Sequence, residues 1–416
     1  MDLRKNTPTF SCAFVVLLLA LGGVQARTWT SKDGSKTFEA ELVSYDERRG
    51  LVTVILPDGN EQTFKREVLS AADILFLGKE ARARGAGGGR RLVVNDVPDE
   101  LPDPDGEAAD MGEPVQVFLL LGQSNMLGFG NAAKLLEIAT GGEKYAHLVD
   151  EDGDWTTRKD VRNVRVMNFK DHKNDWLTVA DTKRIGPEIG IGSVLGEAID
   201  APVMILKSCI GNRSLGWDLL PPGSERYEVD GKIYAGYKDS PDKWDKGTEP
   251  EAINWYAGKQ YDADIASAKQ VLESLEKYYP GARGYEIAGF IFWQGDKDRY
   301  NSAHASRYEL NLVNFIRALR RDFDAPQARF VCATLGQTEK GAGCNDGKIL
   351  EAQLAVDGES GKYAEFEGNV ATVYSHPLSK GGASNSHYGG NPETYMDVGL
   401  ALGRAMAGLL KQQPGS

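Results

Sequence analysis

Apolar runs of strand length alternate with amphipathic stretches of helical length from residue 114 to residue 412. The runs, which are rich in β-branched and aromatic residues, are Val115–Leu121, Val203–Lys207, Ala288–Trp293, Phe330–Leu335 and Val370–Tyr374. The amphipathic stretches are Gly186–Ile199, Asp262–Tyr279, Arg307–Phe323 and Asn391–Leu410. Strands that alternate with helices predict a three-layer α/β domain over residues 114–412, in which helices cover both faces of a parallel sheet.

A different pattern precedes this domain. Polar and apolar residues alternate over Thr37–Leu42 and Leu51–Leu56, and Pro57–Asn60 has the composition of a hairpin turn. Residues 27–77 are therefore predicted to form a small β module that ends in a short helix beginning at Ser70, and a small barrel is the expected form. The initial Arg-Thr-Trp-Thr and two Asp-Gly pairs resemble the SH3-like homology module named after the Sla actin-assembly adaptor. Its ligand is unknown.

Residues 78–113 lack hydrophobic periodicity. Four arginines surround a cluster of glycines, and an acidic stretch with several prolines runs from Asp96 to Glu113. A segment with so few apolar residues cannot bury enough surface to offset the entropy of ordering its backbone. The sequence therefore predicts a disordered linker between the two domains.

The first 26 residues have the composition of a secretory signal peptide. Arg4 and Lys5 form a basic start, Phe14–Leu21 is apolar but short for a membrane span, and Ala26 is a small residue at the expected cleavage site. We expect a secreted or periplasmic protein, with cleavage near Ala26 and no membrane span in the mature chain. The net charge of −12 disfavours nucleic acid as a partner.

Cysteine and histidine are sparse. After removal of the signal peptide three cysteines remain, so at most one internal disulfide can form among Cys209, Cys332 and Cys344. Their spacing is not that of a metal site, and neither a metal nor an organic cofactor is expected. Three further histidines lie in polar stretches and are expected to be exposed: His147, His172 and His304.

Three of the expected strands end in polar turns that contain glycine. Gly122–Asn125 follows the first strand, a turn with Gly211 and Arg213 follows the second, and Gln294–Asp296 follows the third. Parallel strands bring their carboxyl ends to one edge of a sheet, where α/β proteins bind their ligands. Ser124, within the first turn, can act as a nucleophile there if a base and donors to an oxyanion lie nearby.

The base is expected to be a histidine near the C-terminus. His387 comes immediately before the last helix, and His376 follows the last strand. The two bracket a loop rich in glycine and serine, and either could face Ser124. The position of His387 at the entry of the helix favours it.

Residues 115–410 resemble the SGNH hydrolase superfamily, and within it the sialate O-acetylesterase-type domain and related carbohydrate esterases. Gly-Gln-Ser-Asn-Met at 122–126 is similar to the family's nucleophile motif. Trp293-Gln294-Gly295-Asp296 is similar to its Trp-x-Gln-Gly-Glu motif, shortened by one residue and with Asp in place of Glu. The segment around His387 and the helix after it resemble the part of the family that carries the base.

The resemblance implies a role for each matching residue. Ser124 would be the nucleophile and His387 the general base. The backbone N–H groups of Ser124 and Gly211 would bind the oxyanion, and Gln294 would offer an amide to the same oxygen.

Three neighbouring residues are expected to contact the substrate. Gln123 and Asn125 flank the nucleophile and can form hydrogen bonds with what approaches it. Arg213 follows Gly211 closely and is expected either to hold a substrate carboxylate or sulfate or to form a surface ion pair.

The acid of the triad is where the chain departs from the family pattern. Many superfamily members carry Asp three residues before the base, and this chain has Ser384 there. Asp296 is the first candidate for the orienting carboxylate and Asp298 the second. A site without any orienting carboxylate is the third possibility, and the loss of that group lowers the rate by roughly 10⁴-fold in a serine protease.

The sequence as a whole predicts a secreted serine esterase that removes acetyl groups from O-acetylated carbohydrates through an acyl-enzyme. A long insertion after the second strand carries seven aromatic residues, which either stack on sugar rings or form a local hydrophobic cluster: Trp217, Tyr227, Tyr234, Tyr237, Trp244, Trp255 and Tyr256. One alternative is a non-catalytic carbohydrate-binding protein, which is considered because Ser384 stands where many superfamily members have Asp. The other is an esterase for other acyl esters.

Overall fold

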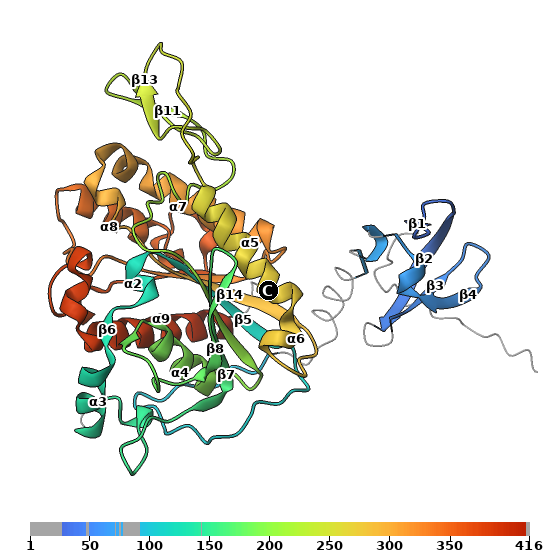
Figure 1. The fold of residues 1–416 in the computed structure, drawn as a ribbon, viewed down its shortest axis with the longest axis horizontal. Helices are drawn as coiled ribbons and strands as arrows, with labels where there is room; N and C mark the ends of the chain where they lie inside the picture. Colours follow the sequence, from blue (N-terminus) through green and yellow to red (C-terminus); the bar gives the residue numbers. More distant parts are fainter. Residues whose placement is uncertain are drawn as a thin grey trace, which may run out of the picture. The chain divides into compact units, whose positions relative to one another are not determined.

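The computed structural model describes residues 27–46, 50–70, 72–74, 76–77, 92–142 and 144–412. The chain divides into two compact units at Arg90–Arg91, each of which is described by itself (Figure 1). We call residues 27–77 the β unit and residues 92–412 the α/β unit. The expected signal peptide at 1–26 and residues 78–91 of the expected linker lie outside the described residues.

The β unit is a four-stranded antiparallel sheet in the order β1-β2-β3-β4. Its elements are β1 (Arg27–Thr30), β2 (Thr37–Asp46), β3 (Leu51–Ile55), β4 (Glu61–Lys65) and the 3₁₀ helix η1 (Arg66–Val68). Its core forms around Trp29, which is fully buried and donates a hydrogen bond from Nε1 to the carbonyl of Ala40 (3.1 Å). The predicted hairpin at 57–60 is confirmed, because the Leu56 N–H donates to the Asn60 carbonyl across it. The likeness to an SH3-like barrel stays a prediction.

The α/β unit contains a seven-stranded sheet in the order β16-β15-β14-β5-β10-β7-β8. In chain order its strands are β5 (Val115–Gly122), β7 (Arg158–Met167), β8 (Lys170–Leu177), β10 (Val203–Ser208), β14 (Tyr285–Trp293), β15 (Arg329–Ala333) and β16 (Val370–Val373). Every neighbouring pair is parallel except β7 with β8. The predicted parallel sheet is confirmed, and the structure adds the antiparallel edge strand β8.

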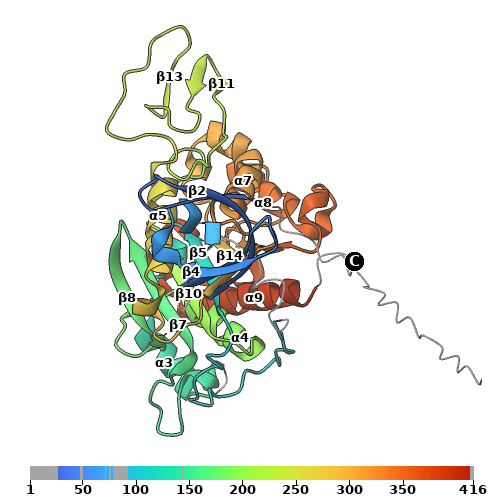
Figure 2. The same ribbon diagram turned by 90° about the vertical axis from the view of Figure 1, so that its right-hand side faces the viewer.

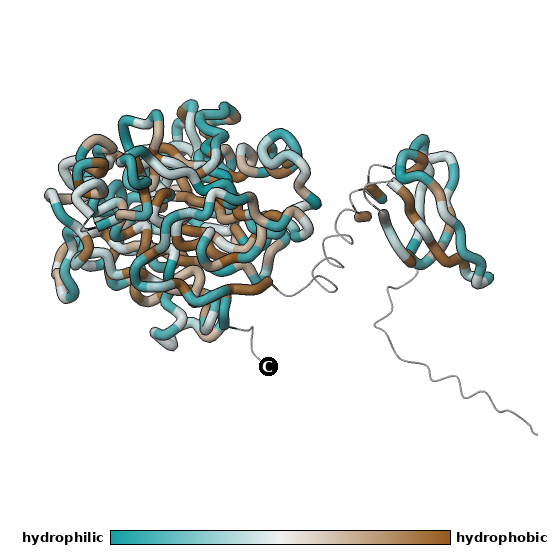
Figure 3. The backbone as a smooth tube through the Cα atoms, turned by 90° about the horizontal axis from the view of Figure 1, so that it is seen from below, coloured by the Kyte–Doolittle hydropathy of each residue, from teal (hydrophilic) through white to brown (hydrophobic). Residues whose placement is uncertain are grey.

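Helices cover both faces of this sheet (Figures 1 and 2). The α-helices are α2 (Ser124–Leu127), α3 (Ala132–Thr140), α4 (Glu188–Ala198), α5 (Lys259–Glu273), α6 (Leu275–Tyr278), α7 (Ser302–Asp322), α8 (Asn345–Ala355) and α9 (Pro392–Lys411). Helices α5, α7 and α8 pack on one hydrophobic core and α3, α4 and α9 on the other. Hydrophobic stretches of the chain run through the middle of this unit, with hydrophilic loops around them (Figure 3).

Short elements connect these layers. The remaining strands are β6 (Gly130–Asn131), β9 (Arg184–Ile185), β11 (Tyr227–Val229), β12 (Lys232–Tyr234) and β13 (Lys243–Asp245). The 3₁₀ helices are η2 (Ala146–Leu148), η3 (Asp298–Tyr300), η4 (Gly358–Ser360), η5 (Ala364–Phe366), η6 (His376–Leu378) and η7 (Ser384–Gly390). The aromatic insertion forms the sheet β11-β12-β13, which projects from the α/β unit (Figure 1).

Residues 92–113, expected as part of a disordered linker, instead lie along the α/β unit. Four apolar side chains of this segment pack against the core under α4 and α9: Leu92, Val94, Val97 and Leu101. The Arg404 guanidinium on α9 donates to the carbonyls of Val97, Pro98 and Asp99 (3.3, 2.7 and 2.9 Å). These long-range contacts order a segment whose own sequence has no periodicity.

We expect a protein that begins at Leu92 to melt cooperatively at a higher temperature than one that begins at Pro114. The shorter protein exposes the apolar surface under residues 92–101 and leaves Arg404 without its three carbonyl partners. Thermal unfolding followed by circular dichroism should show a melting temperature lower by about 5 °C or more. Equal melting temperatures for the two truncations would show that the segment contributes nothing to the unit.

Candidate active site

The turn after β5 places Ser124 at the rim of the sheet. Gly122 has φ of 143°, and a Cβ there would lie 2.3 Å from the Trp293 carbonyl oxygen at the end of β14. Only glycine can occupy this position, because the two strand ends approach so closely. Ser124 then begins α2, and its partly buried hydroxyl forms no hydrogen bond with any described residue.

The loop after β10 brings Gly211 alongside the serine. A Cβ built on Gly211 would lie 3.4 Å from the Cβ of Ser124. Within the described part of the chain, neither the N–H of Ser124 nor that of Gly211 donates a hydrogen bond. Two uncommitted backbone donors beside one hydroxyl are the arrangement that an oxyanion requires.

A buried amide network joins the three strand ends beneath the serine. The Gln294 amide nitrogen lies within hydrogen-bond distance of Gln123 Oε1 (3.2 Å), the Arg213 carbonyl (2.9 Å) and Asp298 Oδ2 (2.6 Å). Its Oε1 accepts from the Tyr308 hydroxyl (2.8 Å). Gln294 and Gln123 are thus engaged with the protein itself. An oxyanion would have to replace one of these partners to receive the amide, so that role stays a prediction.

Asp298 belongs to the same network. Its carboxylate is fully buried and accepts from the N–H groups of Leu215 and Gly216 (2.9 and 2.8 Å) as well as from Gln294. Burial raises the pKa of Asp298 above its ordinary value, and these hydrogen bonds act against that rise. In the described structure Asp298 forms no hydrogen bond with a histidine near Ser124. It secures the start of the aromatic insertion to the end of β14.

His387 lies in a strained turn within η7. His387 and Tyr388 have φ of 53° and 54°, a left-handed conformation that costs free energy in residues other than glycine. The fully buried Tyr388 ring anchors the turn, since its hydroxyl accepts from the Gly336 N–H (3.1 Å) and its ring stacks on Trp293. The His387 ring stacks on Phe129, with centroids 3.8 Å apart and planes at 7°.

Asn125 connects α2, the helix that begins at Ser124, to the loop that carries His387. Its buried amide donates to the Ser384 carbonyl (3.4 Å), and the Tyr395 hydroxyl lies 3.4 Å from both Asn125 Oδ1 and the His387 carbonyl. The residue next to Ser124 therefore fixes the loop that carries His387. In the described residues no hydrogen bond joins Ser124 Oγ to the imidazole itself.

Asp296 follows β14 and contacts the loop that carries His387. Its Oδ1 accepts from Ser384 Oγ (2.5 Å) and from Arg299 Nε (2.9 Å). Partial burial lowers the pKa of His387 below its ordinary value of 6.5; the negative charge of Asp296 opposes this effect, and Arg184 reinforces it. A carboxylate from another strand thus contacts the residue that stands where the superfamily usually has Asp.

His376 lies elsewhere. It follows β16 at the edge of the sheet, and its Nδ1 is 2.8 Å from the Gly336 carbonyl while Nε2 is 3.4 Å from Glu339. Two strands separate β16 from β5 in the sheet order, so the two strand ends are roughly 14 Å apart at the usual strand spacing. In the described residues no hydrogen bond or ion pair joins His376 to the turn that carries Ser124.

Arg213 and the aromatic insertion meet near the strand ends. Arg213 Nε donates to Gln260 (3.1 Å), and its guanidinium lies 5.1 Å from the centre of the Trp255 ring. Arg213 Nη1 also donates to the Asn212 carbonyl (3.3 Å), and no ion pair of Arg213 is present among the described residues. Its contact with a substrate stays a prediction. Trp217 and Trp244 pack against a small buried cluster of the insertion, and stacking of any of these rings on sugar stays a prediction.

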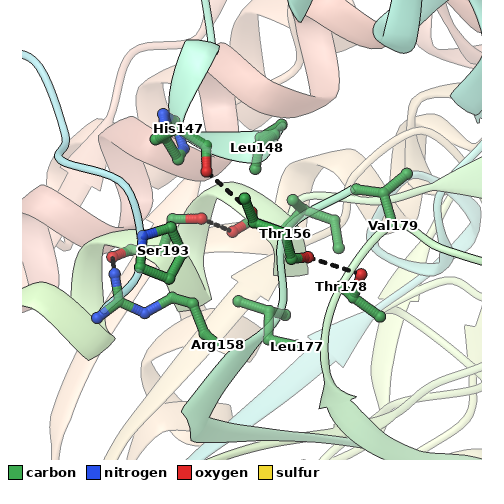
Figure 4. A pocket seen from close by; sticks show the side chains of 10 residues that line it. His147, Leu148, Thr156, Arg158, Leu177, Thr178, Val179 and Ser193 are labelled. Carbon is green, nitrogen blue, oxygen red and sulfur yellow. Dashed lines mark hydrogen bonds between the residues drawn. The ribbon is translucent and has the colours of Figure 1, made fainter. Parts of the chain in front are cut away.

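Two of the three histidines expected at the surface are buried instead. His304 is 5 % exposed and its Nε2 lies 3.1 Å from Asp242. His147 lies in a small apolar pocket, shown in Figure 4, where burial is the main cause that lowers its pKa to about 4. Charge and polarity in the flanking sequence did not predict burial, because burial follows from where η2, which carries His147, and the first turn of α7, which carries His304, pack in the fold. Neither contacts the Ser124 turn in the described residues.

The described residues also include three cysteines. Cys209 and Cys332 are buried and Cys344 is exposed, and the three are free thiols. Burial raises the pKa of Cys209 and of Cys332 to about 12. Among the described residues no cluster of histidine, cysteine and carboxylate could hold a metal ion, and no helix there is long and apolar enough to cross a membrane.

Residues 114–407 match the family model for carbohydrate esterases described as sialic acid-specific acetylesterases. No curated protein matches the chain. Among solved structures, an Arabidopsis thaliana protein is 18 % identical, with 70 % of this chain and 98 % of that one covered and a TM-score of 0.41. A carbohydrate acetylesterase from Xanthomonas citri is 13 % identical (91 % and 67 % covered, TM-score 0.42), and NanS is 14 % identical (62 % and 78 % covered, TM-score 0.33).

Proposed function

The chain belongs to the carbohydrate esterase family of sialic acid-specific acetylesterases, and from this premise we propose that it is a serine esterase that hydrolyses acetyl esters of O-acetylated carbohydrates through an acyl-enzyme. The observation that carries this proposal is the meeting of two uncommitted backbone N–H groups, from Ser124 and Gly211, beside a serine hydroxyl that has no partner in the described residues.

The proposed reaction uses Ser124, His387, two backbone N–H groups and water. Ser124 Oγ attacks the acetyl carbonyl while His387 accepts the hydroxyl proton, and the N–H groups of Ser124 and Gly211 stabilise the oxyanion. The C–O bond to the sugar then breaks, and the sugar oxygen takes the proton from His387. Water attacks the acetyl-serine by the same route, which releases acetate and restores the serine.

We propose that Asp296 supplies the carboxylate of this site. It accepts from Ser384 and acts electrostatically on His387, so it stabilises the imidazolium that forms during the reaction. Ser384 and Arg299 then position the carboxylate. The contact between Asp296 and Ser384 weakens the case for a non-catalytic binding protein, because that case was based on the absence of Asp at position 384.

The amide side chains have a positioning role in this proposal. Gln294 and Gln123 hold the ends of β5 and β14 together, and Asn125 holds the histidine loop against α2.

The proposal for the whole chain has two further parts. Residues 1–26 direct export, and the β unit, as an SH3-like module, has a binding or spacer role.

The pH dependence of the reaction tests this assignment. A general base acts in its neutral form, and the pKa of His387 is lowered, so kcat/KM should rise with pH through an apparent pKa below 6.5 and be level at neutral pH. Acetate release from p-nitrophenyl acetate, corrected for spontaneous hydrolysis, measures the profile.

Two substitutions are expected to shift the acid limb of this profile in opposite directions. Asp296→Asn removes the charge that raises the pKa of His387, so the acid limb should move to lower pH while the plateau rate falls. Arg184→Gln removes a charge that lowers the same pKa, so the limb should move to higher pH. An acid limb that stays in place in both variants would contradict the assignment of His387 and Asp296.

A further inference from the structure

Two buried polar side chains, Gln260 and Asp264, lie one turn apart in α5, which packs along β10. They are 2 % and 1 % exposed, and neither takes part in the proposed reaction. Gln260 Nε2 donates to Asp264 Oδ1 (2.7 Å). In the described part of the chain Asp264 Oδ2 has no hydrogen-bond partner, and no ion pair includes this carboxyl group. A buried carboxyl group with an unpartnered oxygen costs free energy, so its presence requires an explanation.

The other end of the Gln260 amide contacts Arg213, in the loop after β10. Arg213 Nε donates to Gln260 Oε1 (3.1 Å). A guanidinium can only donate hydrogen bonds, so Gln260 must present its oxygen to Arg213 and its nitrogen to Asp264. Asp264 therefore fixes the orientation of the Gln260 amide, and that amide in turn fixes the Arg213 side chain.

The loop after β10 is held at both ends. At its start, Ser208 Oγ donates to the backbone carbonyl of Asp264 (2.8 Å). At its end, the Arg213 carbonyl accepts from the Gln294 amide (2.9 Å), and the Arg213 side chain donates to Gln260. The first two turns of α5 thus contact both ends of the loop that leads from β10 into the aromatic insertion.

The backbone between these two ends has little support of its own. Asn212 has φ of 57°, a left-handed conformation that persists only where surrounding contacts hold it. No backbone N–H of residues 210–213 donates a hydrogen bond in the described structure. The position of the Gly211 N–H beside Ser124 therefore depends on how Arg213 is held. A displacement of about 1 Å at a catalytic group can lower a rate by roughly 10²-fold.

We propose that Gln260 and Asp264 are positioning residues for the proposed esterase reaction. Through the Arg213 side chain they hold the Gly211 N–H at the point where the oxyanion forms. The inference rests on the proposed function, because it concerns the oxyanion that forms when Ser124 attacks. It gives a task in the reaction to two residues of α5 that lie outside the motifs of the strand ends.

Asp264 is expected to act as a neutral hydrogen-bond acceptor. Burial raises the pKa of Asp264 well above its ordinary value, while the hydrogen bond from Gln260 and the charge of Arg213 oppose that rise. Asp264→Leu has no acceptor for the Gln260 amide and should lower kcat on p-nitrophenyl acetate by about tenfold or more. Asparagine has nearly the same shape and keeps an acceptor oxygen, so Asp264→Asn should recover most of that loss.

A double substitution separates positioning from stability. Gln260→Met leaves the buried Asp264 without a donor and should lower both kcat and the melting temperature. Adding Asp264→Leu removes the second polar group and should raise the melting temperature above that of the single variant, because an apolar pair in place of a hydrogen-bonded pair can be nearly neutral.

The activity of the double variant should not recover with its stability. Arg213 still lacks its acceptor, so kcat should stay about ten- to hundredfold below that of the parent while KM changes by less than about threefold. Gln270→Met, at an exposed position of the same helix, is the matched control and should change neither kcat nor the melting temperature. A kcat that returns together with the melting temperature would show a purely structural role.

Inhibition by methylboronic acid measures the oxyanion site itself. A boronate bonded to Ser124 Oγ is a tetrahedral anion, one of whose oxygens occupies the place of the oxyanion, as in a transition-state analogue. Its inhibition constant should rise in the double variant by about the factor by which kcat/KM falls, and it should stay within about twofold of the parent in Gln270→Met.

The outcomes distinguish this inference from the proposed function. If Ser124→Ala is inactive while the double variant keeps its kcat and its affinity for the boronate, the esterase proposal stands and the positioning role is wrong. An unchanged inhibition constant with a lowered kcat would also contradict the positioning role, since the oxyanion site would then be intact. If Ser124→Ala is as active as the parent, the nucleophile assignment and this inference both fail.

Discussion

Replacing Ser124 by alanine is expected to lower kcat for hydrolysis of p-nitrophenyl acetate by about four to six orders of magnitude. The Ser124 hydroxyl stands at the ends of the central strands beside two backbone N–H groups, its own and that of Gly211, that donate to no described residue. The oxyanion donors remain in the variant, so we expect a low residual activity in which water attacks the ester directly.

The same variant should fold as the parent does. The Ser124 hydroxyl forms no hydrogen bond with a described residue, and alanine favours the helix that begins there. Thermal melting should therefore stay within about 2 °C of the parent. Ser386→Ala removes an exposed hydroxyl from the histidine loop and serves as the matched control, with activity within about threefold of the parent. Undiminished activity in Ser124→Ala would place the nucleophile elsewhere.

Replacing His387 by alanine should lower kcat by about three to six orders of magnitude, because the serine then lacks a base. His376→Ala should change kcat by less than about tenfold, since His376 lies at the far edge of the sheet and contacts Gly336 and Glu339. Steady-state kinetics on p-nitrophenyl acetate at pH 7 and 8 provide the comparison. A larger loss in His376→Ala would transfer the role of base to the end of β16.

The double variant adds a test of coupling. In the proposed mechanism Ser124 and His387 act as one unit, so Ser124→Ala combined with His387→Ala should be about as inactive as either single variant. Losses that multiply would mean that the two residues act in separate steps. His387→Gln keeps much of the volume that packs on Phe129, and it separates the loss of the base from the loss of packing.

The architecture followed from local patterns. Each of the five predicted strands is present in the sheet, and the four predicted helices correspond to α4, α5 with α6, α7 and α9. Fully buried strands such as β5 and β10 are continuous apolar runs, which is a signal within the segment itself. Strand β7 and the edge strand β8 were not predicted, because charged residues interrupt their apolar positions.

The two candidate acids show where local reasoning stops. Asp296 and Asp298 lie two residues apart in one turn, and the sequence leaves both open. The fold sends Asp296 toward Ser384 and the histidine loop, and it sends Asp298 toward Leu215 and Gly216. Both sets of partners lie more than 80 residues away in the chain, so nothing in the turn itself could separate the two roles.

Long-range packing also decided the residues that the sequence did not single out. Phe129 stacks on His387 only because the segment after α2 and the loop before α9 meet in the fold. Residues 92–113 became part of the α/β unit in the same way, through contacts with α9.

The sequence by itself determined the α/β class, the turn that carries Ser124 and its family motif, since apolar periodicity and a strand-end glycine turn are properties of neighbouring residues. Only the tertiary structure decided which polar groups meet. A hydrogen bond or ion pair depends on direction and distance to within about an ångström, and the partners come from strand ends that the chain connects over tens to hundreds of residues. The placement of Asp296 against Ser384 therefore belongs to the fold and not to any one segment.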